Sequence, residues 1–350
     1  RYTWYDDNTS ATAGYDSLGT QFNSPSVIQL PGVFVQDELT INESNKLLFG
    51  LRYDYNTIHG SVVTPRINYK LVSKNKKNTL RVGIGNGYRV ANVFTEDHAA
   101  LTGARQVVFT DELKPETSWN GNVNFVKKIY LKSGASIGFD ATAFYTYFNN
   151  RIIPDYITDP NKIIYGNLDG HAVSKGIGIN ADIIFLNGLK ILAGGTLMDV
   201  NFTENGVTQR QLLTERFQGV WSIGYNFPSL RLNMDYTGNV YSPMLLPLLG
   251  PLDNRAGESP WWSLQNIQVT KLLGQQWEVY GGIKNLLNYT PPANSIARPF
   301  DPFDKNVVFD QHGQVVATPD NPNALTFDPT YMFAPNQGIR GYLGIRYTLR

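Results

Sequence analysis

The sequence predicts an all-β fold, and more specifically part of a transmembrane antiparallel β-barrel. Apolar and polar residues alternate with a period of two over many segments, which is typical of half-buried strands. Short and long connections alternate between these segments, as they do in outer-membrane barrels. The 350 residues are 42% apolar, yet no apolar run approaches the roughly 20 residues that a spanning helix needs. Any membrane-spanning elements are therefore expected to be strands.

The alternation is clear in 47–55, where the odd positions are Leu, Phe or Tyr and the even positions include Arg52 and Asp54. It is equally regular in 230–237, where Leu, Leu, Met and Tyr alternate with Arg, Asn, Asp and Thr. Many such segments reach the roughly 9 to 11 residues that a tilted strand needs to cross a bilayer. We expect about thirteen strands, at 31–41, 46–56, 63–73, 78–90, 113–128, 134–150, 163–185, 188–203, 209–227, 229–242, 258–273, 275–287 and 337–349.

The connections between these strands fall into two classes. Tight turns are expected at 42–45, 73–77, 133, 187–188, 228–229 and 274–275. Longer links are expected at 91–112, 150–162, 201–209, 242–257 and 288–336, with 57–62 as the one short exception. In outer-membrane barrels the short turns lie on the periplasmic side and the long loops lie outside. The order of the connections places the last strand running toward the periplasmic side.

The residue types on the two faces indicate which face meets lipid. Aromatic residues gather near strand ends on the apolar face, where amphipathic rings suit the headgroup level: Tyr53, Tyr55, Tyr145, Tyr147, Trp221, Tyr225, Phe227, Trp277 and Tyr347. The middles of strands carry purely apolar residues on that face. The other face carries Arg, Asp, Asn, Gly and Thr, which suit a wet lumen better than a dry core. A soluble β-sandwich would show the same alternation and stays open as an alternative.

Composition excludes several classes of function. With no cysteine, the chain can form neither a disulfide framework nor a thiolate metal site. Lys and Arg number 30 against 29 Asp and Glu, so the net charge of +1 gives no basis for nucleic-acid binding. Neither a Gly-rich phosphate loop nor a nucleophile motif such as GxSxG stands out. We therefore expect no enzyme activity and no cofactor.

Seven segments, taken in order, resemble the TonB-dependent outer-membrane receptor family. Each segment is short, but their order spans nearly the whole chain. They are PGVFVQDE at 31–38, GLRYD at 50–54, TPR at 64–66, GYRVAN at 87–92, LKPE at 113–116, KNLLNY at 284–289 and GYLGIRY at 341–347.

This resemblance implies a fold, a location and partners. Members of the family have a 22-strand barrel in the outer membrane of Gram-negative bacteria, preceded by a plug domain and a TonB box. Residues 1–350 are expected to form a single region, the C-terminal portion of such a barrel without a plug, with 1–30 as an extracellular loop. The implied partners are outer-membrane lipid, the plug and N-terminal strands, the TonB energy-coupling complex and a small bulky ligand. An open sheet leaves unpaired edges that lipid cannot satisfy, so this portion is not expected to insert alone.

The function implied by the resemblance is active uptake of a scarce nutrient, such as an iron–siderophore complex or cobalamin; oligosaccharides and peptides are other ligands of the family. A passive, porin-like barrel remains the alternative, with the soluble sandwich as a third interpretation. Channel conductance without TonB would favour the porin. Expression without detergent would favour the sandwich.

Candidate site residues fall into two groups. Arginines on the polar face are expected to face the lumen, where they either pair with plug carboxylates or steer an anionic ligand: Arg52, Arg66, Arg81, Arg89, Arg231, Arg340 and Arg346. Residues in or beside outer loops are candidate ligand contacts: Glu96, Asp97, His98, Arg105, Trp261 and Trp262.

The loop candidates have ordinary alternatives as well. Segment 95–103 is expected to form a short helix that Thr95 caps and Gly103 ends. His98 beside Asp97 could bind a metal, but a solvated loop histidine explains the same pattern, so we expect no metal site. Trp261 and Trp262 could stack on a flat ligand or anchor the barrel at the membrane interface.

Overall fold

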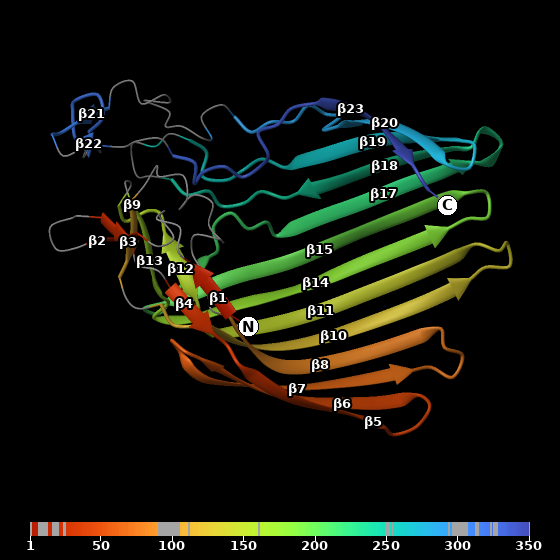
Figure 1. Cartoon of the computed structure of the whole chain (residues 1–350), viewed down its shortest axis with the longest axis horizontal. Coiled ribbons are helices and arrows are strands. Elements are labelled where there is room, and N and C mark those ends of the chain that lie inside the picture. The colour runs from red at the N-terminus through yellow and green to blue at the C-terminus, as the bar shows by residue number, and fades with distance from the viewer. Residues whose placement is uncertain are drawn as a thin grey trace.

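The chain forms one long antiparallel sheet with folded loops at one end (Figure 1). The computed structural model describes residues 2–5, 13–15, 21–23, 26–89, 106–110, 113–159, 162–248, 253, 255–292, 295, 307–311, 315–322, 324 and 328–349. Thirteen strands follow one another in the sheet, and each pairs with its sequence neighbours in the sheet. They are β5 (Gly32–Thr40), β6 (Asn45–Asn56), β7 (Gly60–Val72), β8 (Asn78–Arg89), β10 (Glu116–Tyr130), β11 (Ser136–Asn150), β14 (Gly170–Ile184), β15 (Leu189–Glu204), β17 (Phe217–Phe227), β18 (Leu232–Tyr241), β19 (Trp262–Leu273), β20 (Trp277–Lys284) and β23 (Arg340–Tyr347).

The predicted all-β class and the expected number of strands are confirmed, with two corrections to their bounds. The segment predicted as one strand at 163–185 is two strands: β13 (Lys162–Asn167) belongs to a separate sheet, and β14 begins at Gly170. Segment 209–227 likewise divides into β16 (Val207–Arg210), which pairs with β15, and β17. The predicted link at 201–209 is therefore mostly a hairpin that extends β15 outward. Alternation alone could not reveal these breaks, because both parts continue it.

Six tight turns lie at one end of the sheet, and the longer connections lie at the other end, where the β6–β7 turn at 57–59 is a short exception (Figure 1). The turn between β7 and β8 is closed by a hydrogen bond from Ser73 N to Asn78 O of 3.0 Å, and Lys76 occupies the left-handed region with φ 56°. In the turn between β17 and β18, a single 3-10 turn (η1, Pro228–Leu230) ends at Arg231, which is also left-handed. The predicted positions of the tight turns are therefore confirmed.

The apolar residues of successive strands lie side by side on one face of the sheet. Phe125 of β10 is opposite Ala141 of β11, which is opposite Ile179 of β14. These side chains do not enter a core: Leu343 is 80% exposed and Ile345 is 65% exposed. Aromatic pairs lie toward the strand ends, such as Trp277 and Tyr347, whose ring centroids are 4.7 Å apart. Within the described residues, this face therefore has the surface that lipid covers in a barrel.

In the described part of the chain, no helix is long and apolar enough to cross a membrane.

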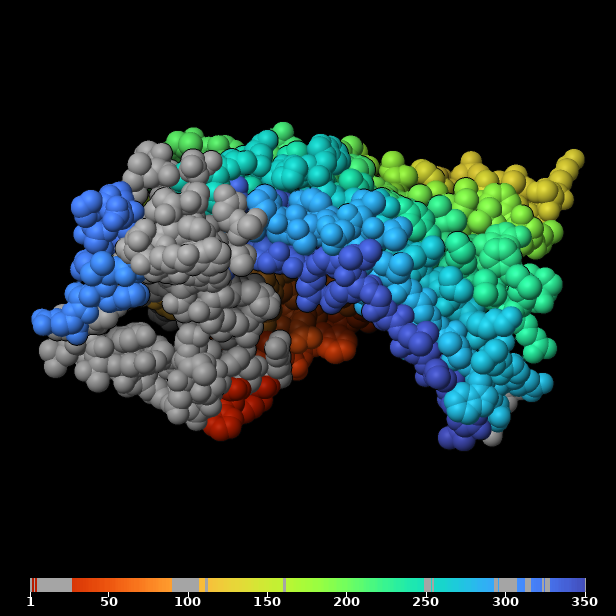
Figure 2. Space-filling view, turned by 90° about the horizontal axis from the view of Figure 1, so that it is seen from above, coloured from red at the N-terminus to blue at the C-terminus, as the bar shows by residue number. Residues whose placement is uncertain are grey.

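The sheet curves strongly, and its two end strands are β5 and β23. Figure 2 shows the last strands, in blue, arching over the first strands, in orange. The curvature turns the polar face inward and the apolar face outward.

The loops carry small sheets and the only two buried apolar clusters that the described residues form. β9 (Gln106–Phe109) pairs in parallel with β13, and β12 (Ile152–Asp155) pairs with the other side of β13. Ile163 and Tyr165 of β13 are fully buried there. The second cluster joins 244–246, Trp262 and 331–334. Further two-stranded pieces are β1 (Tyr2–Tyr5) with β4 (Ser26–Gln29), β2 (Ala13–Tyr15) with β3 (Gln21–Asn23), and β21 (Val308–Phe309) with β22 (Val315–Val316).

Candidate functional site

The inner face of the sheet carries a ladder of polar side chains that crosses several strands. Arg66 of β7 donates through Nη2 to Gln36 Oε1 of β5 at 2.5 Å. Further along the sheet, Arg81 of β8 donates through Nη1 to Asn124 Oδ1 of β10 at 2.9 Å. Asn124 in turn donates through Nδ2 to Asp140 Oδ1 of β11 at 2.7 Å. This ladder gives the inner face a polar wall that carries both positive and negative side chains, which a polar ligand or a polar domain inside the barrel could contact.

Two of the predicted lumen arginines are held near the loop end of the sheet. Arg52 donates through Nε and Nη2 to both carboxylate oxygens of Asp54, at 2.6 and 2.7 Å. Arg89 pairs with Glu116, a residue that is only 5% exposed. The other oxygen of Glu116 accepts the Ile152 backbone N–H at 3.0 Å. Glu116 therefore joins two barrel strands to the start of β12 in the loops.

The remaining three arginines are not brought together with these. Arg346 of β23 pairs with Glu278 at 2.8 Å and lies over the Tyr280 ring. Arg340 is exposed at the start of β23, opposite Lys284. Arg231 lies in the turn after η1 and not on a strand, so alternation with its neighbours assigns it to neither face.

A cavity of about 690 Å³ lies among the outer loops. Its walls come from β12 and the following residues, from β13, from the β15–β16 hairpin and from Leu245. Apolar side chains such as Ile153, Phe202 and Leu212 line it together with Asp155 and Glu204. This mixture of apolar surface and a few charged groups is typical of small-molecule sites.

Arg210 is the only cation that lines this cavity among the described residues. Its guanidinium is fixed by Nη2, which donates to Thr214 O at 2.9 Å and to Pro243 O at 3.2 Å. Burial lowers the pKa of Arg210, although an arginine stays charged at any physiological pH. Nearby, Gln211 Oε1 is buried and accepts no hydrogen bond within the described residues. The cavity therefore offers a ligand a positive charge that is held in place, with Glu258 Oε1 3.9 Å from Arg210 Nη1 as its nearest carboxylate among the described residues.

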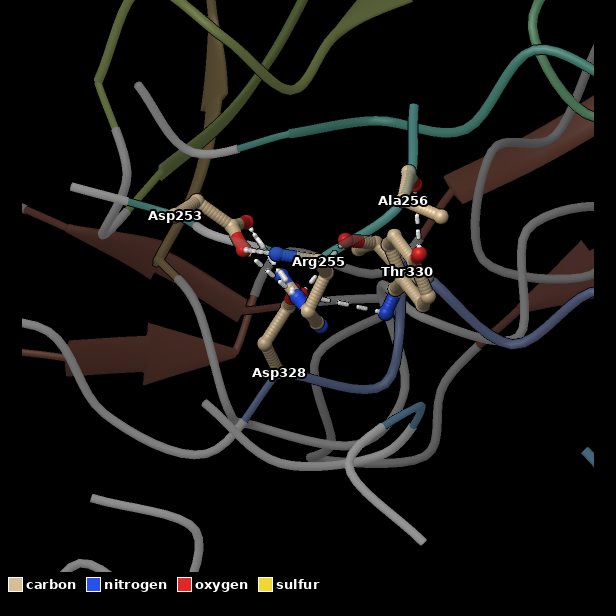
Figure 3. A network of polar contacts seen from close by, with 6 residues as sticks. Asp253, Arg255, Ala256, Asp328 and Thr330 are labelled. Atoms are coloured by element: carbon tan, nitrogen blue, oxygen red, sulfur yellow. Dashed lines mark hydrogen bonds and ion pairs between the residues drawn. The ribbon is translucent and has the colours of Figure 1, made fainter. Parts of the chain in front are cut away.

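A buried ionic network connects two long outer loops (Figure 3). Arg255 Nη2 lies 2.8 Å from Asp253 Oδ2 and 2.9 Å from Asp328 Oδ2, and all three side chains are 1% exposed. The Tyr331 ring lies 4.1 Å from the Arg255 guanidinium carbon, and the Tyr331 hydroxyl donates to Ala256 O at 2.5 Å. The network holds the loop after β18 against the loop before β23.

Protonation in this network follows from its geometry. Burial acts to lower the pKa of Arg255, but hydrogen bonds to Asp253 and Asp328 outweigh it and raise that pKa above its usual value. Burial also raises the pKa of Tyr331. Arg255 therefore remains charged and Tyr331 neutral, so the network keeps its hydrogen bonds at physiological pH.

The two predicted loop tryptophans occupy different environments. Trp261 is 57% exposed and lies 6.1 Å from the Phe217 ring. Trp262 is 7% exposed, and its ring is stacked on Tyr241 at 4.2 Å and on Tyr289 at 5.9 Å. Trp261 therefore has a surface free for a ligand or for lipid, whereas Trp262 is part of the packed base of the loops.

Four predicted loop residues, Glu96, Asp97, His98 and Arg105, and the expected helix at 95–103 lie outside the described residues. Among the histidines that are described, His171 is stacked on Tyr147 at 5.2 Å. No group of three or more His, Asp or Glu side chains suited to a metal ion occurs in the described residues.

Sequence reasoning missed the cavity, the parallel pairing of β9 with β13 and the ionic network. The strongest available signal was the charged residues in otherwise Pro- and Asn-rich loops, such as Asp253 and Arg255 two positions apart. Their partner Asp328 is 73 residues away from Arg255, so spacing alone could not show it.

A curved antiparallel sheet with an exposed apolar outer face, a polar inner face, short turns at one end and folded loops at the other defines a transmembrane β-barrel. The family model described as "TonB dependent receptor-like, beta-barrel" matches residues 1–286. The chain therefore belongs to the TonB-dependent receptor β-barrel family, whose members are outer-membrane receptors of Gram-negative bacteria and not enzymes.

Curated relatives resemble part of the chain. The iron-regulated outer membrane virulence protein of Vibrio cholerae is 28% identical over 121 residues, which are 34% of this chain and 18% of that protein. The probable TonB-dependent siderophore receptor PirA of Acinetobacter baumannii is 24% identical over 197 residues, 50% of this chain and 24% of that protein. The matched segments thus span less than a quarter of either relative.

Solved structures resemble nearly the whole chain in fold. A variant of the ferric enterobactin receptor PfeA from Pseudomonas aeruginosa gives a TM-score of 0.65 at 16% identity, covering 99% of this chain and 49% of that one. The siderophore receptor PirA from Acinetobacter baumannii gives a TM-score of 0.66 at 15% identity, and the match covers 99% of this chain and 50% of PirA. The chain therefore spans about half the length of these barrel-containing receptors.

Proposed function

We propose that this chain is the C-terminal part of the barrel of an outer-membrane receptor that takes up an iron–siderophore complex with energy supplied through TonB. The observation that carries the proposal is membership of the TonB-dependent receptor family, together with relatives whose names specify siderophore receptors. Residues 1–30 are then an outer loop. The plug domain, the other barrel strands and TonB are its partners.

The geometry supports the proposal at two levels of the barrel. At the outer end, the cavity that Arg210 and Phe202 line is large enough for a small bulky ligand. Below it, the inner polar ladder around Arg66 and Arg81 offers hydrogen bonds to a plug that fills the lumen. The ligand is first held by the loops and then passes inward along this wall.

The test is uptake and binding with the full-length protein that the parent gene encodes. Cells that express it are given iron-55 loaded enterobactin, an iron-55 loaded hydroxamate siderophore or radiolabelled cyanocobalamin, in strains with and without TonB. We expect accumulation of one of the iron complexes, and only when TonB is present. Uptake of cyanocobalamin alone would contradict the siderophore assignment. Solute flux or channel conductance that persists without TonB would instead support the porin.

The cavity is tested separately by Arg210→Ala, with Arg216→Ala as the matched control in the same loop. Arg216 is not among the residues that line the cavity. We expect the Arg210 variant to bind the transported iron complex about tenfold or more weakly, since a charge-assisted contact is worth about 1.5–3 kcal/mol. Equal affinities for both variants would place the ligand elsewhere in the loops and leave the uptake function untouched.

A further inference from the structure

Six lysines are concentrated at the turn end of four neighbouring strands, β7, β8, β10 and β11. They lie in and beside the turns β7–β8 and β10–β11, and all are exposed. We refer to them as the turn-rim lysines: Lys74, Lys76, Lys77, Lys127, Lys128 and Lys132. The two segments that carry them, 70–82 and 125–138, contain no Asp or Glu. Because the whole chain has a net charge of only +1, this is a strong local excess of positive charge.

One of these lysines lies on the outer apolar face. Lys127 alternates with Phe125 and Ile129 on β10 and is opposite Phe139 of β11. A charged ammonium cannot stay in hydrocarbon, so a lysine on the lipid-facing side extends its apolar stem until the charge reaches the headgroup level. Lys127 therefore marks the height at which the phosphates of the turn-side leaflet lie.

The other lysines lie at or just beyond this height. Asn78, the first residue of β8, is opposite Lys127, and the β7–β8 turn follows directly outward from it. At about 3.3 Å per residue, Lys77, Lys76 and Lys74 are within roughly one Debye length of that level. Lys132 occupies the next turn, between the ends of β10 and β11.

The turn that carries three of the lysines is held in a fixed conformation. Ser73 Oγ donates to Asn75 Oδ1 at 2.7 Å, and that same oxygen accepts the Lys77 N–H at 3.0 Å. The Lys77 ammonium lies 5.8 Å from the centroid of the Tyr130 ring. Tyr130 and Leu131 are themselves exposed, by 62% and 44%. On β10, Tyr130 lies on the opposite face from Lys127 and Ile129, so the pair of Lys77 and Tyr130 lies at the rim on the inner side of the sheet, beyond the last residues that face lipid.

We propose that the turn-rim lysines form a binding surface for anionic phospholipid headgroups in the periplasmic leaflet of the outer membrane. Charge complementarity supports this occupant, and the position of Lys127 on the lipid-facing side favours lipid over an acidic periplasmic protein. In the described part of the chain, no carboxylate forms an ion pair with any of the six lysines. Their charges are thus available to phosphate groups.

The test measures which lipids the full-length protein retains. The protein is purified in a neutral maltoside detergent, mixed with equal amounts of phosphatidylglycerol and phosphatidylcholine of matched acyl chains, and analysed by native mass spectrometry. We expect phosphatidylglycerol to be retained about tenfold or more over phosphatidylcholine, because each basic residue near such a surface adds to the attraction. The preference is expected to fall as salt rises.

A sixfold Lys→Gln variant is compared with a sixfold Lys→Arg variant that keeps the charge. We expect the Gln variant to lose the preference and the Arg variant to keep it. If the sixfold Gln variant does not fold, the threefold variant Lys74→Gln, Lys76→Gln, Lys77→Gln, confined to one exposed turn, replaces it and is expected to lose most of the preference. An unchanged preference in the Gln variant overturns the proposal.

Two further outcomes would also overturn it. A wild-type protein without any preference for phosphatidylglycerol would leave an acidic periplasmic protein as the occupant to test. Added lipopolysaccharide, whose phosphates belong to the opposite leaflet, is expected to be retained equally by wild type and Gln variant. If the Gln variant instead loses both phosphatidylglycerol and lipopolysaccharide, the lysines attract anions without specificity, and the proposal is overturned.

Discussion

Arg255 and Asp328 are 73 residues apart in the sequence, yet Arg255 Nη2 lies 2.9 Å from Asp328 Oδ2, with both side chains buried. The same guanidinium also binds Asp253. One arginine thus connects two outer loops that carry little secondary structure within the described residues. The loops around the proposed ligand entrance are therefore held by specific contacts, and these contacts can be tested one at a time.

Arg255→Met is expected to loosen both loops. The change leaves two buried carboxylates without their cation, and breaking a buried ion pair from one side costs about 3–5 kcal/mol. Hydrogen exchange of 255–261 and 328–334 in the full-length protein should become faster, while exchange in the barrel strands is unchanged. Arg346→Met is the control, because the Arg346 side chain is 63% exposed and such a pair contributes about 1 kcal/mol or less. Equal effects of the two variants would contradict a special role of the network.

Tyr331→Phe removes the hydroxyl group of Tyr331 and keeps its ring, so it tests the contributions of the two groups separately. The variant loses the hydrogen bond to Ala256 O but keeps the aromatic face 4.1 Å from the Arg255 guanidinium carbon. We expect a local destabilisation of about 0.5–1.5 kcal/mol. Tyr331→Leu also removes the cation–π contact and should cost more. Hydrogen exchange of 255–261 measures the local stability in both variants. If exchange in the Leu variant is no faster than in the Phe variant, the ring contributes little.

Glu116→Ala is expected to detach β12 from the barrel. Its carboxylate binds Arg89 and accepts the Ile152 N–H at 3.0 Å, so removal leaves an unpaired backbone donor and costs about 1–3 kcal/mol. The Ile152 amide should then exchange faster. Glu38→Ala serves as the control, because Glu38 and its partner Lys46 are both exposed at the other end of the sheet. Unchanged protection of Ile152 would mean that β13 alone holds β12 in place.

Gly238→Ala tests how the sheet accommodates a large ring. Gly238 of β18 is opposite Trp221 of β17, and a Cβ at Gly238 would lie 2.2 Å from Trp221 Cζ2. The indole would have to move, which costs about 1–3 kcal/mol for an overpacked site. Gly121→Ala is the matched control, because a Cβ there meets nothing within 4 Å. Thermal unfolding of the full-length protein in detergent, followed by the heat-modifiable gel shift, should separate the two; similar midpoints would contradict the prediction.

The strands could be predicted closely from the sequence because each face of the sheet has one environment along its whole length. The segment expected at 46–56 is β6 at Asn45–Asn56, and that expected at 78–90 is β8 at Asn78–Arg89. Where the sheet ends, a second environment begins, and alternation ceases to be informative. The break before Gly170 shows this: β13 turns into the loop cluster although its residues continue the pattern of β14.

The candidate site was less accessible to sequence reasoning, for a physical reason. Face assignment placed Arg66 and Arg81 among polar neighbours on the same face of the sheet, because register follows from local pairing. The loop contacts join residues that are distant in sequence and pack in no regular period. Trp262 illustrates this: its position at the start of a strand indicated an interface residue, but contacts with Tyr241 and Tyr289 bury it under the loops.

The two end strands also restrict how the sheet can become a closed cylinder. β5 and β23 both run from the loop end to the turn end, because thirteen strands alternate in direction between and including them. Brought together directly, these two edges would meet in parallel orientation. A wall that is antiparallel throughout therefore requires an odd number of additional strands between β23 and β5, whichever polypeptide supplies them.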